Sequence, residues 1–280
     1  MTDGFLLVAK PAGITSHDAV DRVRRALGIR KVGHAGTLDP LAEGLLLMGA
    51  GRGTRLLRFL ADLDKEYEGT ARLGIETDTL DAEGTVVATG AVDVDEGALL
   101  VALAALTGAV SQLPPAYSAV KVGGEALYRA ARAGRPARAE ARVVRVDAFD
   151  LLRFATPDVE FRVVCSGGTY VRALVADLGH ALGCGAHLTR LVRTRIGPFR
   201  LSDAAPPDAP GSPLPLDRAV AHLPAVTLQD EEVRPARNGA TLGPAGIDGP
   251  YAVRDPGGKL VGVYRDRGAK AVAEVVVAPA

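Results

Sequence analysis

The chain of 280 residues is 48% hydrophobic and 24% charged, and its 33 basic residues are balanced by 33 acidic ones. This composition indicates an ordinary water-soluble globular protein with room for a large core and two domains. The two cysteines, Cys165 and Cys184, lie in no disulfide or metal-binding pattern, which argues against both and fits the reducing cytoplasm. No apolar run approaches the roughly 18 residues of a membrane span. The first residues also lack the basic and apolar pattern of a signal peptide.

The charges are unevenly distributed along the chain. Residues 61–100 hold two basic and eleven acidic side chains, whereas residues 115–145 hold seven basic and two acidic ones. Residues 186–200 contain four arginines and no acid. Folding could gather the basic segments into a local phosphate-binding surface on a neutral protein. Composition alone favours the simpler interpretation that the charge blocks are solvated faces.

The N-terminal part of the chain predicts alternating strands and helices. The expected elements are a strand at 4–10, a helix from Thr15 or Ser16 to Gly28, a buried strand at 45–49, and a helix at 54–63. The glycine-rich segment 49–54 lacks the Gly-Lys-Ser/Thr ending of a nucleotide-binding loop, so it is expected to be a turn.

A loop carrying one carboxylate, Asp39, lies between these elements. It belongs to the string GHAGTLDPLAEGLL at residues 33–46. The ring of Pro40 disfavours the α conformation for Asp39, so the carboxylate is expected on a loop and not on a helix face. An Asp-Pro pair in a glycine-rich segment is usually a turn. A loop acid held between rigid apolar elements is, however, also what a nucleophile or general base requires.

Residues 65–73 alternate between apolar and polar side chains and predict a strand. Tyr67 then points inward, at the sheet edge, as either a core tyrosine or an aromatic surface for a ligand. The later expected elements are a hairpin connection at 77–84, a strand at 85–88, a helix from Asp95 to about Leu106, a helix at 125–133, strands at 142–153 and 158–165, and a helix ending at Gly183.

The C-terminal part begins with a change of composition. Five of the twelve residues from 204 to 215 are proline, which predicts a semi-rigid linker. Beyond it, short apolar runs separated by glycine turns predict a small β-domain at about 224–280.

Several motifs in the first 200 residues resemble, in the same order, motifs of the TruB family of tRNA pseudouridine synthases. They are K-P-x-G-x-T-S at 10–16, G-H-x-G-T-L-D-P-x-A-x-G-L-L at 33–46, K-x-Y at 65–67, Q-x-P-P-x-Y-S-A-x-K at 112–121, G-T-Y-x-R at 168–172 and C-G-A-H at 184–187. The resemblance implies isomerisation of uridine 55, in the T arm of tRNA, to pseudouridine after the base is flipped out of the RNA.

The resemblance also implies roles for individual residues. Asp39 matches the essential aspartate, which attacks the sugar or the base or removes a sugar proton. Residues implied to bind the substrate are His34, Tyr67, Tyr170, Arg172 and Leu191. Arg172 would hold the acid ionised, Tyr67 would stack on the base, and His34 would fill the space the base vacates. Further RNA contacts are expected from Lys10, Lys121, Arg190 and Arg193, although Lys10 is expected mainly to brace the Asp39 loop.

The implied fold is α+β, with a mixed, largely antiparallel sheet, flanking helices and a C-terminal PUA-like RNA-binding domain. The expected boundaries are 1–215 for the catalytic domain, 112–142 for an RNA-binding insertion, 204–215 for the linker and 224–280 for the PUA-like domain. No metal, cofactor, membrane or obligate protein partner is expected besides tRNA.

Three alternatives remain open at this point. The same chemistry could be directed to another RNA by a guide RNA. The chain could instead be a non-catalytic RNA-binding or tRNA-folding protein. A glycosidase-like hydrolase would need a second carboxylate opposite Asp39, and the nearby Glu43 is expected to be a solvated residue.

Overall fold

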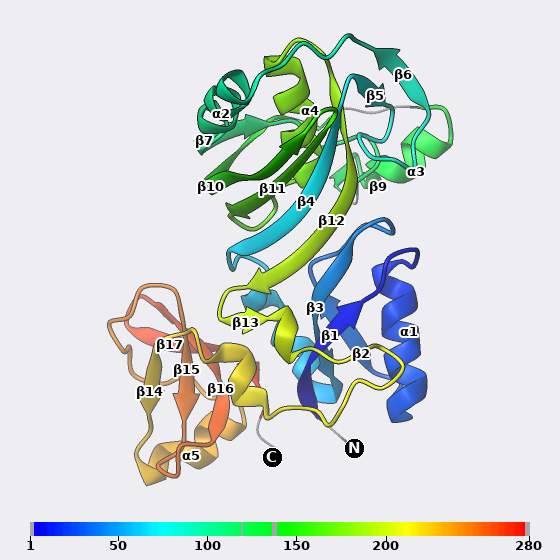
Figure 1. The fold of residues 1–280 in the computed structure, drawn as a ribbon. Coiled ribbons are helices and arrows are strands. Elements are labelled where there is room, and N and C mark those ends of the chain that lie inside the picture. Colours follow the sequence, from blue (N-terminus) through cyan, green and yellow to red (C-terminus); the bar gives the residue numbers. More distant parts are fainter. Residues whose placement is uncertain (1–2, 119, 136–138, 278–280) are drawn as a thin grey trace.

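The computed structural model describes residues 3–118, 120–135 and 139–277. One sheet of nine strands runs through the molecule in the order β1-β3-β12-β4-β11-β10-β7, with β2 paired to β3 and β13 paired to β12 (Figure 1). Its strands are β1 (Gly4–Lys10), β2 (Val32–Ala35), β3 (Glu43–Ala50), β4 (Lys65–Leu73), β7 (Gly108–Gln112), β10 (Arg142–Ala155), β11 (Asp158–Cys165), β12 (Ala186–Ile196) and β13 (Phe199–Arg200). Within this sheet only the pair β3–β12 is parallel, among the strands described. The expected mixed, largely antiparallel sheet is confirmed.

Helix α1 (Ser16–Leu27) shows how local sequence sets the N-terminal elements. The Thr15 hydroxyl accepts from the Asp18 N–H, and the Asp18 carboxylate accepts from the Thr15 N–H, which forms a capping box. Gly28 ends the helix in the left-handed conformation, with φ of 65°. Thr15 is therefore the cap, and Ser16 is left to bond elsewhere.

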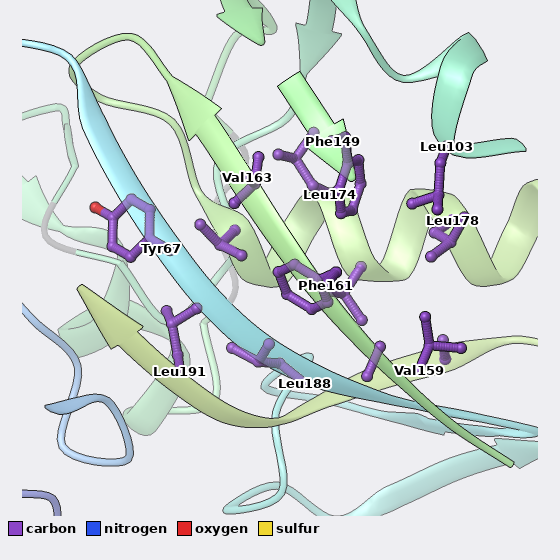
Figure 2. Packing of buried hydrophobic residues seen from close by; sticks show 14 of the residues in the cluster. Tyr67, Leu103, Phe149, Val159, Phe161, Val163, Leu174, Leu178, Leu188 and Leu191 are labelled. Carbon is purple, nitrogen blue, oxygen red and sulfur yellow. The ribbon is translucent and has the colours of Figure 1, made fainter. Parts of the chain in front are cut away.

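Helices α2 (Glu96–Ala105) and α4 (Val171–Ala181) cover one face of the long strands (Figure 1). Figure 2 shows Leu174 and Leu178 of α4 and Leu103 of α2 against Phe149 and Phe161 of the sheet. The two phenylalanine rings meet edge to face, with their centroids 5.3 Å apart. This apolar core fixes the position of α4, which carries the predicted site residue Arg172 in its first turn and Tyr170 at its N-cap.

Smaller elements extend from this framework. They are β5 (Ile75–Thr77), β6 (Val86–Thr89), β8 (Lys121–Val122), β9 (Glu125–Ala126) and α3 (Leu127–Arg132), followed by β14 (Ala225–Thr227), α5 (Asp230–Arg237), β15 (Pro250–Arg254), β16 (Leu260–Arg267) and β17 (Lys270–Val276). The last three strands and β14 form a four-stranded sheet in the order β14-β15-β16-β17. The expected small C-terminal β-domain is present.

The proline-rich segment 204–215 is not a free spacer. It returns along β1, where the Ala9 N–H donates to the Ala205 carbonyl and the Leu214 N–H donates to the Phe5 carbonyl, both at 2.8 Å. The C-terminal sheet also shares a buried cluster with the N-terminal strands, which includes Phe5 and Val263. The two parts of the chain are therefore joined by a common core as well as by the segment.

Several elements differ from the sequence-based expectations, and strands β2, β7 and β12 were not among the predicted ones. The helix expected at 54–63 is replaced by two 3-10 helices, Gly51–Arg55 and Leu57–Leu60, neither of which has a side-chain cap. Helix α5 is missing from the predicted elements because it is short, polar and contains Pro235. No helix within the described ranges is both long and apolar enough to cross a membrane.

Candidate active site

A cavity of about 260 Å³ opens between the Asp39 loop and the first turn of α4. Six of the predicted site residues line it: Asp39, Tyr67, Tyr170, Arg172, Leu191 and Arg193. Four others do not: Lys10, His34, Lys121 and Arg190. Asp39 is the sole carboxylate among the described residues that line the cavity.

Asp39 pairs with Arg172 across 133 positions of sequence. The Arg172 Nε donates to Asp39 Oδ2 at 2.9 Å, and the Arg172 side chain is 4% exposed whereas that of Asp39 is 37% exposed. A charge-assisted hydrogen bond from a buried guanidinium fixes the direction of the carboxylate. The carboxylate is thus held on one side and open to the cavity on the other.

The rest of the Arg172 guanidinium is also engaged. One terminal nitrogen donates to the Thr79 carbonyl at 2.7 Å and lies 3.5 Å from Asp81 Oδ2, and the other donates to the Tyr117 carbonyl at 3.0 Å. Asp81 is 5% exposed and accepts from the Thr79 hydroxyl at 2.6 Å. These contacts fix the direction of the guanidinium. Asp81 was not among the predicted site residues, since the acid-rich segment 77–84 predicts only a connection.

Lys10 braces the Asp39 loop from behind. Its ammonium donates to the carbonyls of Ile14 at 2.7 Å, Pro11 at 2.9 Å and Pro40 at 3.4 Å. Lys10 is 1% exposed, and burial lowers its pKa to about 8. These contacts support the bracing role, and a contact of Lys10 with RNA stays a prediction.

Arg193 and Ser16 hold the same loop from two further sides. The Arg193 Nε donates to the Leu45 carbonyl at 2.7 Å, and its terminal nitrogens donate to the Gly36 and Thr37 carbonyls at 3.3 and 3.4 Å. The Ser16 hydroxyl donates to the Leu38 carbonyl at 2.9 Å and accepts from the Leu38 N–H at 2.8 Å. Arg193 is 1% exposed and lines the cavity, so its role in RNA binding stays a prediction.

One glycine is required where β3 meets β12. A Cβ on Gly44 would lie 2.4 Å from the Arg193 carbonyl oxygen, and its φ of 111° is unfavourable for other residues. Because the two strands approach closely at Gly44, the Arg193 side chain can bond the backbone of the Asp39 loop. The glycine in the loop motif is thus explained by packing.

Tyr67 and Leu191 form the apolar wall of the cavity. Tyr67 is 8% exposed, and burial raises the pKa of its phenol, so the hydroxyl stays protonated at neutral pH. Figure 2 shows Tyr67 at one end of the apolar cluster, with its hydroxyl directed away from Phe161. Its strand, β4, pairs with β11 and β12, so the expectation of a sheet-edge tyrosine is wrong.

Tyr170 is held at the start of α4 by two residues that were not predicted. The Gln112 side chain donates to the Tyr170 carbonyl at 3.0 Å and accepts from its N–H at 2.7 Å. The Arg142 guanidinium lies 4.9 Å from the centre of the Tyr170 ring, within the range of a cation–π contact. Gln112 belongs to a quoted motif, but nothing in the sequence indicates that Arg142 would lie over this ring.

The remaining predicted residues lie outside the cavity. His34 is on β2, half-buried, and its Nδ1 is enclosed without a hydrogen bond among the described residues. Burial is the main cause that lowers the pKa of His34, which favours the neutral imidazole. Lys121 is exposed on β8, and Arg190 lies 3.5 Å from Glu43 at the surface.

This arrangement suits chemistry on a flat, polar ring. One carboxylate, that of Asp39, faces a cavity lined by two tyrosines and by buried cations. A hydrolase that uses two opposed carboxylates needs a second acid, and Glu43 is paired outside the cavity. Within the described ranges, no group of three or more His, Cys, Asp or Glu side chains is placed to hold a metal ion.

Family models match most of the chain. Residues 24–171 match the model described as TruB family pseudouridylate synthase, N-terminal domain. Residues 172–206 match the tRNA pseudouridylate synthase B C-terminal domain, and residues 223–278 match tRNA Pseudouridine synthase II, C terminal.

Relatives named tRNA pseudouridine synthase B match nearly the whole chain. The protein from Mycobacterium sp. (strain KMS) is 47% identical over 99% of this chain and 97% of its own length. That from Thermobifida fusca (strain YX) is 45% identical over 99% of both chains.

Solved structures show the same fold over 99% of this chain. A Cbf5-Nop10-Gar1 complex matches with a TM-score of 0.75, 29% identity and 84% of the matched chain covered. An H/ACA RNP bound to a substrate RNA containing 2′-deoxyuridine matches with a TM-score of 0.74, 26% identity and 85% coverage. The chain therefore belongs to the TruB family of tRNA pseudouridine synthases, isomerases that act on tRNA.

Proposed function

We propose that this protein converts uridine 55 in the T arm of tRNA to pseudouridine, with Asp39 as the essential catalytic residue. The observation that carries the proposal is the Asp39–Arg172 pair at the mouth of the cavity, with Tyr67 and Leu191 beneath it. The pair fixes the direction of the carboxylate and leaves one side of it free to react.

Each side chain answers one need of the reaction. The uracil must detach from C1′, rotate and reattach through C5 without leaving the site. Tyr67 and Leu191 give the base a flat apolar surface on which to stay during the rotation. Asp39 acts on the sugar or the base. Arg172 keeps its direction because four acceptors surround its guanidinium.

The uridine must first be flipped out of the folded T arm, which costs a few kcal/mol. The basic insertion at 112–142, with Lys121, and the exposed Arg190 would contact the RNA backbone around the cavity. His34, two residues before the cavity rim at Gly36, would lie next to the gap left by the base.

The C-terminal domain at 224–280 would add RNA contacts as a PUA-like module. Its sheet shares a buried cluster with the N-terminal strands, so deleting it would expose apolar side chains and disturb the catalytic part. Its role is better tested with substitutions of exposed arginines such as Arg267, which should weaken tRNA binding without altering turnover at saturating tRNA.

The solved relatives are complexes named for Cbf5, Nop10 and Gar1. We infer that the present protein works without protein or guide-RNA partners, as its match of 97–99% of the length of bacterial synthases suggests.

The test is tritium release from an isolated T-arm stem-loop labelled at carbon 5 of uridine, with the purified protein alone. Release is expected, and it should disappear when cytidine replaces the uridine at position 55. Release that persists after this replacement would place the target elsewhere. Tight binding without release would favour a tRNA-folding role or a missing partner.

A further inference from the structure

A second buried lysine, Lys65, lines the same cavity as Asp39. It is the first residue of β4 and is 6% exposed. Side chains two positions apart on a strand point to the same face, about 7 Å from each other. Lys65 and Tyr67 are such a pair, and both line the cavity. The lysine therefore lies beside the tyrosine on which the uracil would stack.

The Lys65 ammonium is incompletely bonded. Its one hydrogen bond within the described part of the chain goes to the Ala61 carbonyl, and no described carboxylate lies within ion-pair distance. An ammonium has three N–H donors, so two remain for whatever fills the cavity. Lys10, by contrast, uses its ammonium on three backbone carbonyls and does not line the cavity.

The charges around Lys65 do not replace a direct partner. Asp64 pairs with Arg145 at 2.8 Å, and Asp62 is exposed. The Cys165 thiol is neutral because burial raises its pKa to about 11. The groups that face Lys65 are Arg193, Cys165, Asp62 and Asp64, and the other charged groups of the cavity are Asp39, Arg142 and Arg172. Burial, reinforced by Arg193, lowers the pKa of Lys65 to about 8, so a costly charge is retained at neutral pH.

We propose that Lys65 is a catalytic residue whose ammonium stabilises the negative charge that develops on the uracil during isomerisation. This inference rests on the proposed function. When the C1′–N1 bond breaks, its electron pair leaves with N1 and spreads to O2 and O4 of the ring. The charge is quenched when C5 forms the new bond to C1′, after which C5 loses its proton and N1 gains one. Asp39 compensates the positive charge that develops on the sugar, and Lys65 compensates the negative charge on the base.

A fixed cation is effective here because Lys65 is itself buried, and a charge interaction is stronger away from water. Removing one such donor from an oxyanion site typically lowers turnover by about 10²–10³-fold. The same loss is expected for Lys65→Met in single-turnover assays, with tRNA affinity unchanged. Lys65→Arg keeps the charge and is expected to recover much of the rate.

The decisive readout is the pH dependence of turnover between about pH 6.5 and 9.5. Wild type should lose activity as Lys65 deprotonates near pH 8, whereas Lys65→Arg should keep its activity to higher pH. Ionisation of the uridine affects both proteins equally and cancels in their ratio. Lys10→Met is the matched control, because Lys10 is equally buried and has a similar pKa. Lys10→Met should lower the melting temperature, but its turnover should still fall at alkaline pH as in wild type (the alkaline limb of the pH profile).

The inference is overturned if Lys65→Met turns over like wild type, if it weakens only tRNA binding, or if the alkaline limb vanishes in Lys10→Met but persists in Lys65→Arg. If Lys65→Met fails to fold, the comparison of Lys65→Arg with wild type still decides. A wild-type protein that forms no pseudouridine at all refutes the proposed function instead, so the two failures are distinguishable.

Discussion

The Asp39 loop and the insertion between β7 and β10 are built in opposite ways. Lys10, Arg193 and Ser16 are all buried, and each bonds the backbone of the loop or its flanks. The described part of the insertion has two strands of two residues each and the six-residue α3, and both partners of its Arg135–Glu125 pair are exposed. The loop is therefore positioned before substrate arrives, whereas the hydrogen bonds of the described residues 120–135 stay within the insertion, which favours movement of the insertion as a unit.

The two regions meet at Arg172. Its guanidinium bonds Asp39 with one nitrogen and the Tyr117 carbonyl, at the root of the insertion, with another. Ser118, the next residue, is 5% exposed and lines the cavity. The root of the insertion thus belongs to the rigid region, and the contrast begins only beyond it.

The largest effect is expected from the loop itself. Asp39→Asn preserves shape and removes the reactive carboxylate, so turnover should fall on the order of 10⁴-fold or more, as for other essential nucleophiles. The affinity for tRNA should stay nearly the same, because the insertion and the exposed cations are untouched. Single-turnover rates and filter binding measure the two separately. Retained turnover would remove Asp39 from the mechanism.

The next largest effect is expected where the regions meet. Arg172→Met leaves Asp39 without its partner and Asp81 buried without compensation, so turnover should fall by about 10²–10³-fold. Unfolding should become easier by about 3–5 kcal/mol, the usual cost of breaking a buried ion pair. Adding Asp81→Asn should restore part of the stability and little of the turnover.

The matched control for that experiment is Arg162→Met. Arg162 pairs with Glu66 and Asp150 at 2.7 and 2.8 Å but is 36% exposed, so its loss should cost about 1 kcal/mol or less. Denaturant unfolding compares the two variants directly. Equal losses would mean that burial does not distinguish these ion pairs.

A smaller effect is expected from the supports of the loop. Ser16→Ala removes both hydrogen bonds to Leu38 and leaves two backbone groups unpaired, at a cost of about 1–3 kcal/mol. Asp39 should shift slightly, and a misplacement of this kind can lower turnover by up to about 100-fold. Ser202→Ala, at an exposed serine, is the control and should change neither quantity.

Local chemistry explains what could be predicted from the sequence. The alternation of apolar and polar residues predicted β4. Thr15 and Gly28 marked the two ends of α1, and Pro40 indicated that Asp39 lies on a loop. The pairing of Asp39 with Arg172, implied by the family motif, is present at 2.9 Å. These features depend on short stretches of chain, and each stretch carries its own signal.

What could not be predicted depends on contacts between distant segments. Nothing near Arg193 in the sequence indicates that its guanidinium turns inward to the Leu45 carbonyl, 148 positions away. Asp81 likewise becomes a buried partner of Arg172 only when β12 and the 77–84 segment meet, as the Asp81–Leu188 bridge shows. A lysine or arginine that braces a loop cannot be told in the sequence from one that binds RNA. Only their burial in the structure distinguishes Lys10 and Arg193 from the exposed Lys121.

The smallest effect is expected in the insertion. Lys121 is exposed on β8, and Lys121→Ala should weaken tRNA binding modestly while turnover at saturating tRNA is unchanged. If its ammonium meets one phosphate, the slope of log affinity against log salt should fall by about one unit. Arg193→Met, at a buried cation, should leave this slope unchanged and lower turnover and stability instead. If the two variants were to exchange these effects, the rigid and the adaptable regions would have been assigned the wrong way round.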